Sequence, residues 1–269
     1  MLVRDAPELQ VFMLRRNLRS RFVAGAYLFP GGAVDADDAA PELLARAHGI
    51  DATVADERLA IGPGALRFWV AAIRESFEEA GVLLARDSQT GEPIDVGHPE
   101  SATGLDRDRR ALIAGERTFF GVVRDRDLLV DAGALDPVAR WITPPGAPRR
   151  YDTWFFVAAA PDGHAYLHDD DETVASTWIR PADALERARR EEIQLIFPTY
   201  RSLQVLAGYR TVSELVGDVR AAWLGGHPLR RVTPEHGWML DLDGSDHADD
   251  LADALTHSTA TGGRRSRTR

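Results

Sequence analysis

Three glutamates fall within one turn of a predicted helix. Apolar spacing predicts that helix over about residues 65–80, and Gly81 is suited to end it in the left-handed conformation. Glu75, Glu78 and Glu79 then occupy positions i, i+3 and i+4, so they share one helix face. The fold must therefore either solvate three like charges or place a cation between them.

Two interpretations of this glutamate cluster are open. The first is a solvated acidic face, in which each like-charge pair costs roughly 0.2–0.5 kcal/mol. The second is a metal site, because the C-terminal end of a helix carries partial negative charge and disfavours carboxylates that lack a cation. Arg74 is spaced to pair with Glu78 at i+4 but cannot neutralise all three charges. Oxygen ligands favour Mg²⁺ or Mn²⁺, which are the expected cofactors.

The composition excludes most other metal and nucleophile chemistry. The 269 residues include no cysteine, which excludes disulfides, thiolate zinc sites, iron–sulfur clusters and cysteine nucleophiles. All 32 basic residues are arginines, so a lysine Schiff base and a P-loop lysine are excluded as well. The formal net charge of −10 argues against nucleic acid as the main partner.

Strand and helix patterns are mixed along the chain, which predicts one α/β or α+β domain with insertions. With no run of eighteen apolar residues and no signal-peptide pattern, a cytoplasmic protein without a membrane partner is expected. Strands are predicted at 9–16, 25–29, 140–143, 151–160 and 173–179. Helices are predicted at 41–48, 65–80, within 105–126, from Pro181, and at 199–206 and 213–224. Residues 86–104 are predicted as a loop, and the polar composition from about residue 242 predicts a frayed tail over 242–269.

A loop with two adjacent glycines precedes the carboxylate helix. Phe29-Pro30-Gly31-Gly32 follows a predicted strand, and Asp38 lies six positions after the second glycine. Together with the segment Arg74-Glu75-Ser76-Phe77-Glu78-Glu79-Ala80-Gly81, this loop resembles the signature box of the Nudix hydrolases, which cleave nucleoside diphosphates linked to another moiety. Asp38 stands where that family usually has Glu, and Ser76 where it usually has an aliphatic residue. Here 35 residues separate Asp38 from Arg74, so the box is split by an insertion.

The split box resembles the peroxisomal coenzyme A diphosphatase-like branch of that family. Segments 140–144, 149–156 and 178–185 are similar to the same branch, so the resemblance covers roughly residues 9–210. The fold that it implies is α/β (α+β), a Nudix α/β/α sandwich with a mixed sheet, helical insertions and a helical C-terminal extension. It also implies one domain over residues 1–241, with insertions at about 39–64 and 86–138.

The resemblance further implies roles for individual residues. Glu75, Glu78, Glu79 and the backbone carbonyl of Gly32 are the expected metal ligands. Glu78, Glu79 and Arg74 are the expected catalytic residues, with Arg74 orienting a glutamate. The general base is left open between the box and Glu172, although a solvated acidic loop is the preferred interpretation of the run around Glu172.

Three arginines and a tyrosine are the candidate substrate-binding residues: Arg21, Arg149, Arg150 and Tyr151. Arginines can clamp phosphates and a tyrosine can stack on a base, although a basic surface turn explains the same residues equally well. Coenzyme A-cleaving relatives carry an Arg, a His and a Gly before the glycine loop, and this chain has Val23 at the His position. The aromatic residues Trp141, Trp154 and Phe155 are expected to lie in the core.

These expectations describe a metal-dependent hydrolase of a nucleoside diphosphate-X compound, with coenzyme A or an acyl-coenzyme A as the leading substrate. ADP-ribose and a dinucleotide such as NADH are the alternative substrates. A Nudix module that senses a ligand without turnover is the alternative from another class of protein. The expected partner is a small nucleotide, and a homodimer is left open.

Overall fold

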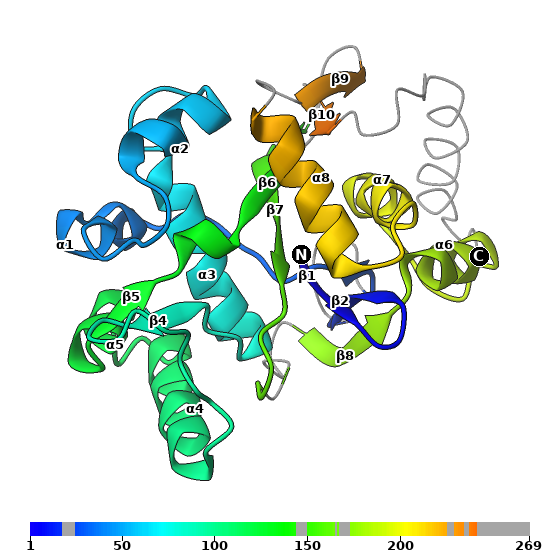
Figure 1. Ribbon diagram of the computed structural model, residues 1–269. Helices are drawn as coiled ribbons and strands as arrows, with labels where there is room; N and C mark the ends of the chain where they lie inside the picture. The colour runs from blue at the N-terminus through cyan, green and yellow to red at the C-terminus, as the bar shows by residue number, and fades with distance from the viewer. Residues whose placement is uncertain are drawn as a thin grey trace, which may run out of the picture.

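The structure of the protein is a computed structural model. It describes residues 1–17, 25–143, 150–164, 166, 173–224, 229–233 and 237–240. A central sheet lies between two groups of helices, with α1–α5 on one side and α6–α8 on the other (Figure 1). The mixed α/β architecture with several helices confirms the fold class predicted from the sequence.

Strands and helices are interspersed along the chain. The strands are β1 (Leu2–Asp5), β2 (Leu9–Arg16), β3 (Tyr27–Leu28), β4 (Ala85–Asp87), β5 (Leu128–Val130), β6 (Asp136–Ile142), β7 (Asp152–Ala159), β8 (Thr173–Ile179), β9 (Leu229–Thr233) and β10 (Gly237–Leu240). The helices are α1 (Pro41–Leu44), α2 (Ala52–Leu59), α3 (Leu66–Ala80), α4 (Pro99–Ile113), α5 (Phe119–Asp125), α6 (Pro181–Arg189), α7 (Phe197–Leu206) and α8 (Val212–Leu224). The described residues also form two 3-10 helices, η1 (Ala36–Ala39) and η2 (Ala132–Ala134).

The main sheet is mixed. Its order is β3-β2-β1-β7-β6-β10-β9, with β8 also paired to β2, and β4 and β5 form a separate two-stranded sheet. β1 runs parallel to β7, whereas the other strand pairs are antiparallel. β1 pairs only with Ala158 and Ala159 at the end of β7. Among the described strands, the first half of β7 therefore has only β6 as a partner, and its other edge is open.

Alternating side chains on the strands fill two cores, one on each face of the sheet. On β2, Phe12 and Leu14 join the core beneath α3, whereas Val11 and Met13 join the core beneath α7 and α8. This alternation follows from the two-residue period of a strand. The near-continuous apolar run on β2 is thus explained by burial of both faces.

Helix α3 is packed deep in the first core. Trp69 is fully buried, and its indole N–H donates to the backbone carbonyl of Leu135 at 3.0 Å. The helix ends at Gly81, which has a φ of 68° and donates its backbone N–H to the carbonyl of Phe77. The predicted left-handed end at Gly81 is confirmed.

The prediction of a loop over residues 86–104 was wrong in part. This range contains the end of β4 and the first turns of α4, which begins at Pro99. β4 pairs with β5 more than 40 residues later, as in the Ala85–Val130 pair, and such a long-range contact leaves no local pattern. The short strands β1, β5, β9 and β10 and helix α2 were missed, and β3 is only two residues long.

Helices α1 and α2 lie within the range predicted as the first insertion, and β4, α4, α5 and β5 lie within or at the edge of the second. The division of the chain into one domain with these insertions stays a prediction. Within the described ranges, no helix combines the length and the apolar character that crossing a membrane requires.

Candidate active site

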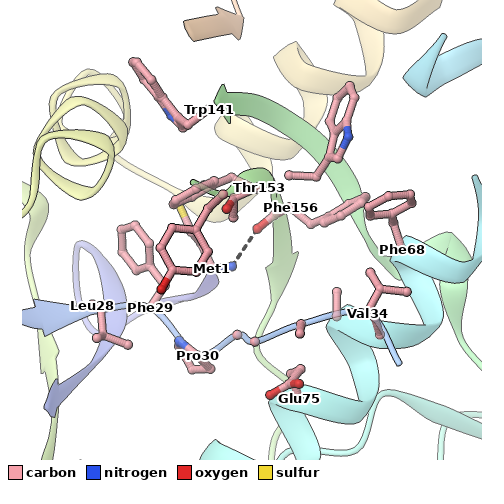
Figure 2. Close-up of a pocket in the computed structure, with 18 of the residues that line it drawn as sticks. Met1, Leu28, Phe29, Pro30, Val34, Phe68, Glu75, Trp141, Thr153 and Phe156 are labelled. Carbon is pink, nitrogen blue, oxygen red and sulfur yellow. Dashed lines mark hydrogen bonds between the residues drawn. The ribbon is translucent and has the colours of Figure 1, made fainter. Parts of the chain in front are cut away.

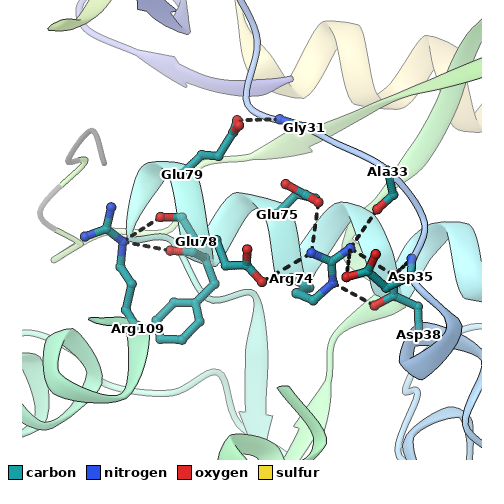
Figure 3. Close-up of polar contacts among 10 residues, drawn as sticks. Gly31, Ala33, Asp35, Asp38, Arg74, Glu75, Glu78, Glu79 and Arg109 are labelled. Atoms are coloured by element: carbon teal, nitrogen blue, oxygen red, sulfur yellow. Dashed lines mark hydrogen bonds and ion pairs between the residues drawn. The ribbon is translucent and has the colours of Figure 1, made fainter. Parts of the chain in front are cut away.

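Arg74 is the centre of the polar contacts around α3 (Figure 3). Its Nε and Nη2 atoms donate to the two carboxylate oxygens of Asp38 at 2.8 and 3.0 Å. Nη2 also donates to the carbonyl of Ala33, and Nη1 donates to Glu75 at 2.8 Å and to Glu78 at 3.2 Å. Burial alone would lower the pKa of Arg74, but the hydrogen bond to Asp38 and the nearby carboxylates raise it. The charged guanidinium therefore joins the glycine loop and η1 to α3.

The glycine loop packs directly against two of the three glutamates. Gly31 donates its backbone N–H to Glu79 at 2.8 Å. A Cβ atom placed on Gly32 would lie 2.5 Å from a carboxylate oxygen of Glu75, so a larger residue at this position would displace the Glu75 carboxylate. Gly31 has a φ of 153°, which also favours glycine. Close approach to Glu75 thus explains the glycine at position 32, and the positive φ explains the glycine at position 31. Each glycine brings the backbone close to a carboxylate.

The carboxylate of Glu75 is held in an environment that disfavours its charge. Burial raises the pKa of Glu75 to about 7, the charge of Arg74 and its hydrogen bond oppose that rise, and the charge of Glu78 adds to it. A positive ion beside Glu75 would reverse the penalty of burial. The site would therefore gain from a bound cation.

The donor set matches a hard divalent cation in its chemistry. Glu75, Glu78 and Glu79 offer carboxylate oxygens, and the backbone of Gly32 lies against Glu75. In the described part of the chain, however, no three acidic or histidine side chains converge closely enough to hold an ion, since Glu75 and Glu78 both contact Arg74. The predicted pairing of Arg74 with Glu78 is confirmed.

A cavity of about 1610 Å³ opens beside the glycine loop. Figure 2 shows Glu75 at one end of it and Trp141 at the other, with the segment from Leu28 to Val34 running between them. Glu75 and Glu79 line the cavity, but Glu78 and Arg74 are not part of its wall. Helix α3 carries all three glutamates within one turn, as expected, and Glu78 accepts a hydrogen bond from Arg74.

The cavity also reaches two of the predicted substrate-binding residues. Arg150 and Tyr151 line it, and Arg150 donates through Nε to the carbonyl of Thr143 at 3.0 Å. Tyr151 is 40% exposed. Three further candidates, Arg21, Arg149 and Glu172, lie outside the described residues.

The aromatic residues expected in the core serve two purposes. Trp141 is only 6% exposed and packs edge-on against Phe197 with ring centroids 5.3 Å apart. Trp154 and Phe155 are partly buried beside the cores. All three also line the cavity, so these core residues shape its wall.

Arg109 was missed by the sequence analysis. This residue of α4 is 5% exposed, and its Nε donates to the carbonyls of Phe77 and Glu78 at 3.1 and 2.8 Å. A cation at the C-terminal end of α3 is favourable because that end carries partial negative charge. Arg109 therefore holds the last turn of α3, directly behind the glutamates. No spacing in the sequence signals this contact, which joins positions more than 30 residues apart.

Comparisons with known proteins found a family model, related proteins and a similar structure. A family model described as the NUDT19 Nudix domain matches residues 50–206. Two curated relatives, both named acyl-coenzyme A diphosphatase NUDT19, come from Gallus gallus and Homo sapiens and are each 29% identical to this chain. These alignments cover 77% of this chain but only 63% and 62% of the relatives, so the chain spans less than two thirds of their length.

A solved structure resembles this one over most of both chains. It is the crystal structure of a Nudix hydrolase from Alicyclobacillus acidocaldarius, 30% identical, with a TM-score of 0.65. The match covers 80% of this chain and 92% of that chain. The family model covers more than half of the chain, including all of α3, and the glycine loop that precedes the matched range completes the box in space. The chain therefore belongs to the Nudix hydrolase family, in the group described by the NUDT19 Nudix domain.

Proposed function

We propose that this chain is a divalent-metal-dependent hydrolase that cleaves the diphosphate bond of coenzyme A or an acyl-coenzyme A. One observation carries the proposal: Glu75 and Glu79 meet the Gly31–Gly32 backbone at the wall of a large cavity. The names of the NUDT19 relatives support the substrate class.

The metal would be Mg²⁺ or Mn²⁺, held by Glu75, Glu78 and Glu79 with the carbonyl of Gly32. When bound, such an ion neutralises charge on the diphosphate and lowers the pKa of the attacking water. Glu78 would exchange its contact with Arg74 for the ion. Asp38 would hold Arg74 in place with the ion bound, because it accepts two of the guanidinium hydrogen bonds. The general base would be one of three residues: Glu78, Glu79 or Glu172.

The nucleotide end of the substrate is assigned to Arg150 and Tyr151, with Arg149 and Arg21 as further contacts to phosphate. Arginine binds phosphate through two parallel hydrogen bonds, and an aromatic ring can stack on a base. The cavity exceeds the volume of roughly 300–1,000 Å³ that is usual for small-ligand sites. The cavity therefore has room for an acyl-coenzyme A as well as for the smaller ADP-ribose.

A substrate panel tests the proposal. Coenzyme A, acetyl-coenzyme A, ADP-ribose and NADH are each incubated with Mg²⁺ or Mn²⁺, and the products are identified by mass. Release of adenosine 3′,5′-bisphosphate and a phosphopantetheine fragment from the first two is the expected result. If AMP is released from ADP-ribose or NADH and neither coenzyme A compound is cleaved, the substrate is ADP-ribose or NADH and not coenzyme A. No turnover of any compound would favour a ligand-sensing module.

Two further expectations accompany this function. A cytoplasmic location is proposed from the sequence alone, and so is an activity that involves neither nucleic acid nor a membrane. A homodimer is a further proposal, which sedimentation of the purified chain tests directly.

A further inference from the structure

Helix α3 exposes a stripe of side chains to the cavity. Phe68, Ala72 and Glu75 are only partly buried, although most of the helix is buried. They are spaced by four and three residues, and Glu79 follows four residues later, so all four share one face. All four line the cavity. The stripe is apolar toward the start of α3 and acidic toward its end.

Further apolar side chains lie beside the apolar half of the stripe. Figure 2 shows Val34 and Phe68 close together at one side of the cavity, with Phe156 beside them. Val34 comes from the segment after the glycine loop and is 36% exposed. Exposed apolar side chains that line one part of a cavity gain free energy when an apolar ligand covers them. This half of the cavity therefore suits an aliphatic chain better than a charged group.

The stripe begins at the proposed diphosphate site. An α-helix rises about 1.5 Å per residue, which places Ala72 roughly 4–5 Å and Phe68 roughly 10 Å from Glu75 along the axis. A chain attached to a phosphate beside Glu75 would pass Ala72 first and then Phe68. Alanine has the smallest side chain apart from glycine. The methyl group of Ala72 therefore leaves the passage along the stripe wide next to Glu75.

We propose that this stripe binds the tail attached to the distal phosphate of the substrate, and that the small side chain of Ala72 keeps the passage open. The proposal rests on the proposed function and adds an orientation to it. The tail is an amide-containing aliphatic arm with an acyl group at its end. The nucleotide then takes the part of the cavity that Arg150 and Tyr151 line, where they offer a cation and an aromatic ring.

The test compares binding of the two product halves, so it needs no turnover. S-octanoyl-4′-phosphopantetheine and adenosine 3′,5′-bisphosphate are titrated by calorimetry into the full chain with Mg²⁺ present. Ala72→Leu is expected to weaken binding of the pantetheine compound by about tenfold or more, because added carbons obstruct the passage. Binding of the adenosine compound is expected to stay within about twofold. Ala111→Leu is the matched control, since Ala111 lies on α4, is partly buried and does not line the cavity.

A second variant protects the test against misfolding. Phe68→Ala removes the far end of the apolar wall instead of adding atoms, and it is expected to weaken binding of the pantetheine compound by about fivefold. Equal losses for both compounds in both variants would overturn the proposal, as would unchanged binding of the pantetheine compound. Loss for the adenosine compound alone would reverse the orientation and overturn it as well.

Failure of this inference and failure of the proposed function are separable. If the chain cleaves coenzyme A and Ala72→Leu binds both product compounds as the wild type does, the proposed function holds and the tail binds elsewhere. If the chain cleaves no diphosphate but Ala72→Leu loses only the pantetheine compound, the tail site stands and the function is wrong.

Discussion

Gly32→Ala separates the position of the Glu75 carboxylate from the stability of the fold. The new Cβ would lie 2.5 Å from one carboxylate oxygen of Glu75 and 2.6 Å from its carboxyl carbon and second oxygen. Ordinary contact begins near 3.4 Å, so the carboxylate must retreat by about 0.9 Å. Gly32 is not among the glycines with positive φ, and its backbone therefore accepts alanine.

The expected signature is a loss of activity with little loss of stability. The end of a flexible side chain moves at low cost, so the free energy of unfolding should fall by no more than about 1 kcal/mol. A displacement of about 1 Å in a catalytic group costs on the order of 100-fold in rate, or about 2.7 kcal/mol. The assays are kcat/KM for coenzyme A with Mg²⁺, and thermal unfolding of the same preparations.

Gly31→Ala is the contrasting control. No atom lies within 4 Å of a Cβ on Gly31, but its φ of 153° is strained for alanine. The cost should therefore appear as about 1–3 kcal/mol of stability. A wild-type kcat/KM in Gly32→Ala would contradict the expected loss of activity, because catalysis would then not require a fixed position of the Glu75 carboxylate.

Two other outcomes are expected from the contacts of Arg74 and the charge of Glu75. Asp38→Ala should lower the free energy of unfolding by about 3–5 kcal/mol in chemical denaturation, since it leaves the buried guanidinium of Arg74 without its best partner. A change below about 1 kcal/mol would show that Asp38 does not stabilise Arg74. Because burial raises the pKa of Glu75 to about 7, protons compete with the ion below that pH. Mn²⁺ affinity should therefore fall from about pH 8 to about pH 6, and Glu75→Gln should flatten that dependence; an equal slope in both proteins would assign the proton to another group.

The parts of the site that could be predicted from the sequence are local patterns. Glu75 and Glu79 lie within one turn of α3, and the end of that helix at Gly81 follows from the residues themselves. The contact between Arg74 and Asp38 joins positions 36 residues apart; the resemblance placed both residues in one box but predicted no contact between them. Physical spacing alone could not predict it, because the insertion between them carries its own helices.

The parts that could not be predicted depend on long-range packing. Arg109 reaches α3 from α4, and nothing around it in the sequence differs from an ordinary charged helix. The strands β4 and β5 have three residues each, too few for a period to appear. Helix periodicity predicts a face, but the contacts of Arg74 decide which glutamates on that face reach the cavity. Glu78 shares the helix turn of Glu75 and Glu79, as expected, but it contacts Arg74 and does not line the cavity.

The proposed diphosphatase chemistry depends above all on a divalent cation held by Glu75 and Glu79. Electron paramagnetic resonance of Mn²⁺ titrated into the wild type and Glu79→Gln measures this dependence, because the glutamine keeps the size of the side chain and loses only its charge. We expect the variant to bind Mn²⁺ at least about tenfold more weakly, with unchanged thermal unfolding. Equal Mn²⁺ affinity in both proteins would contradict the proposed site, since Glu79 would then not be a ligand of the metal.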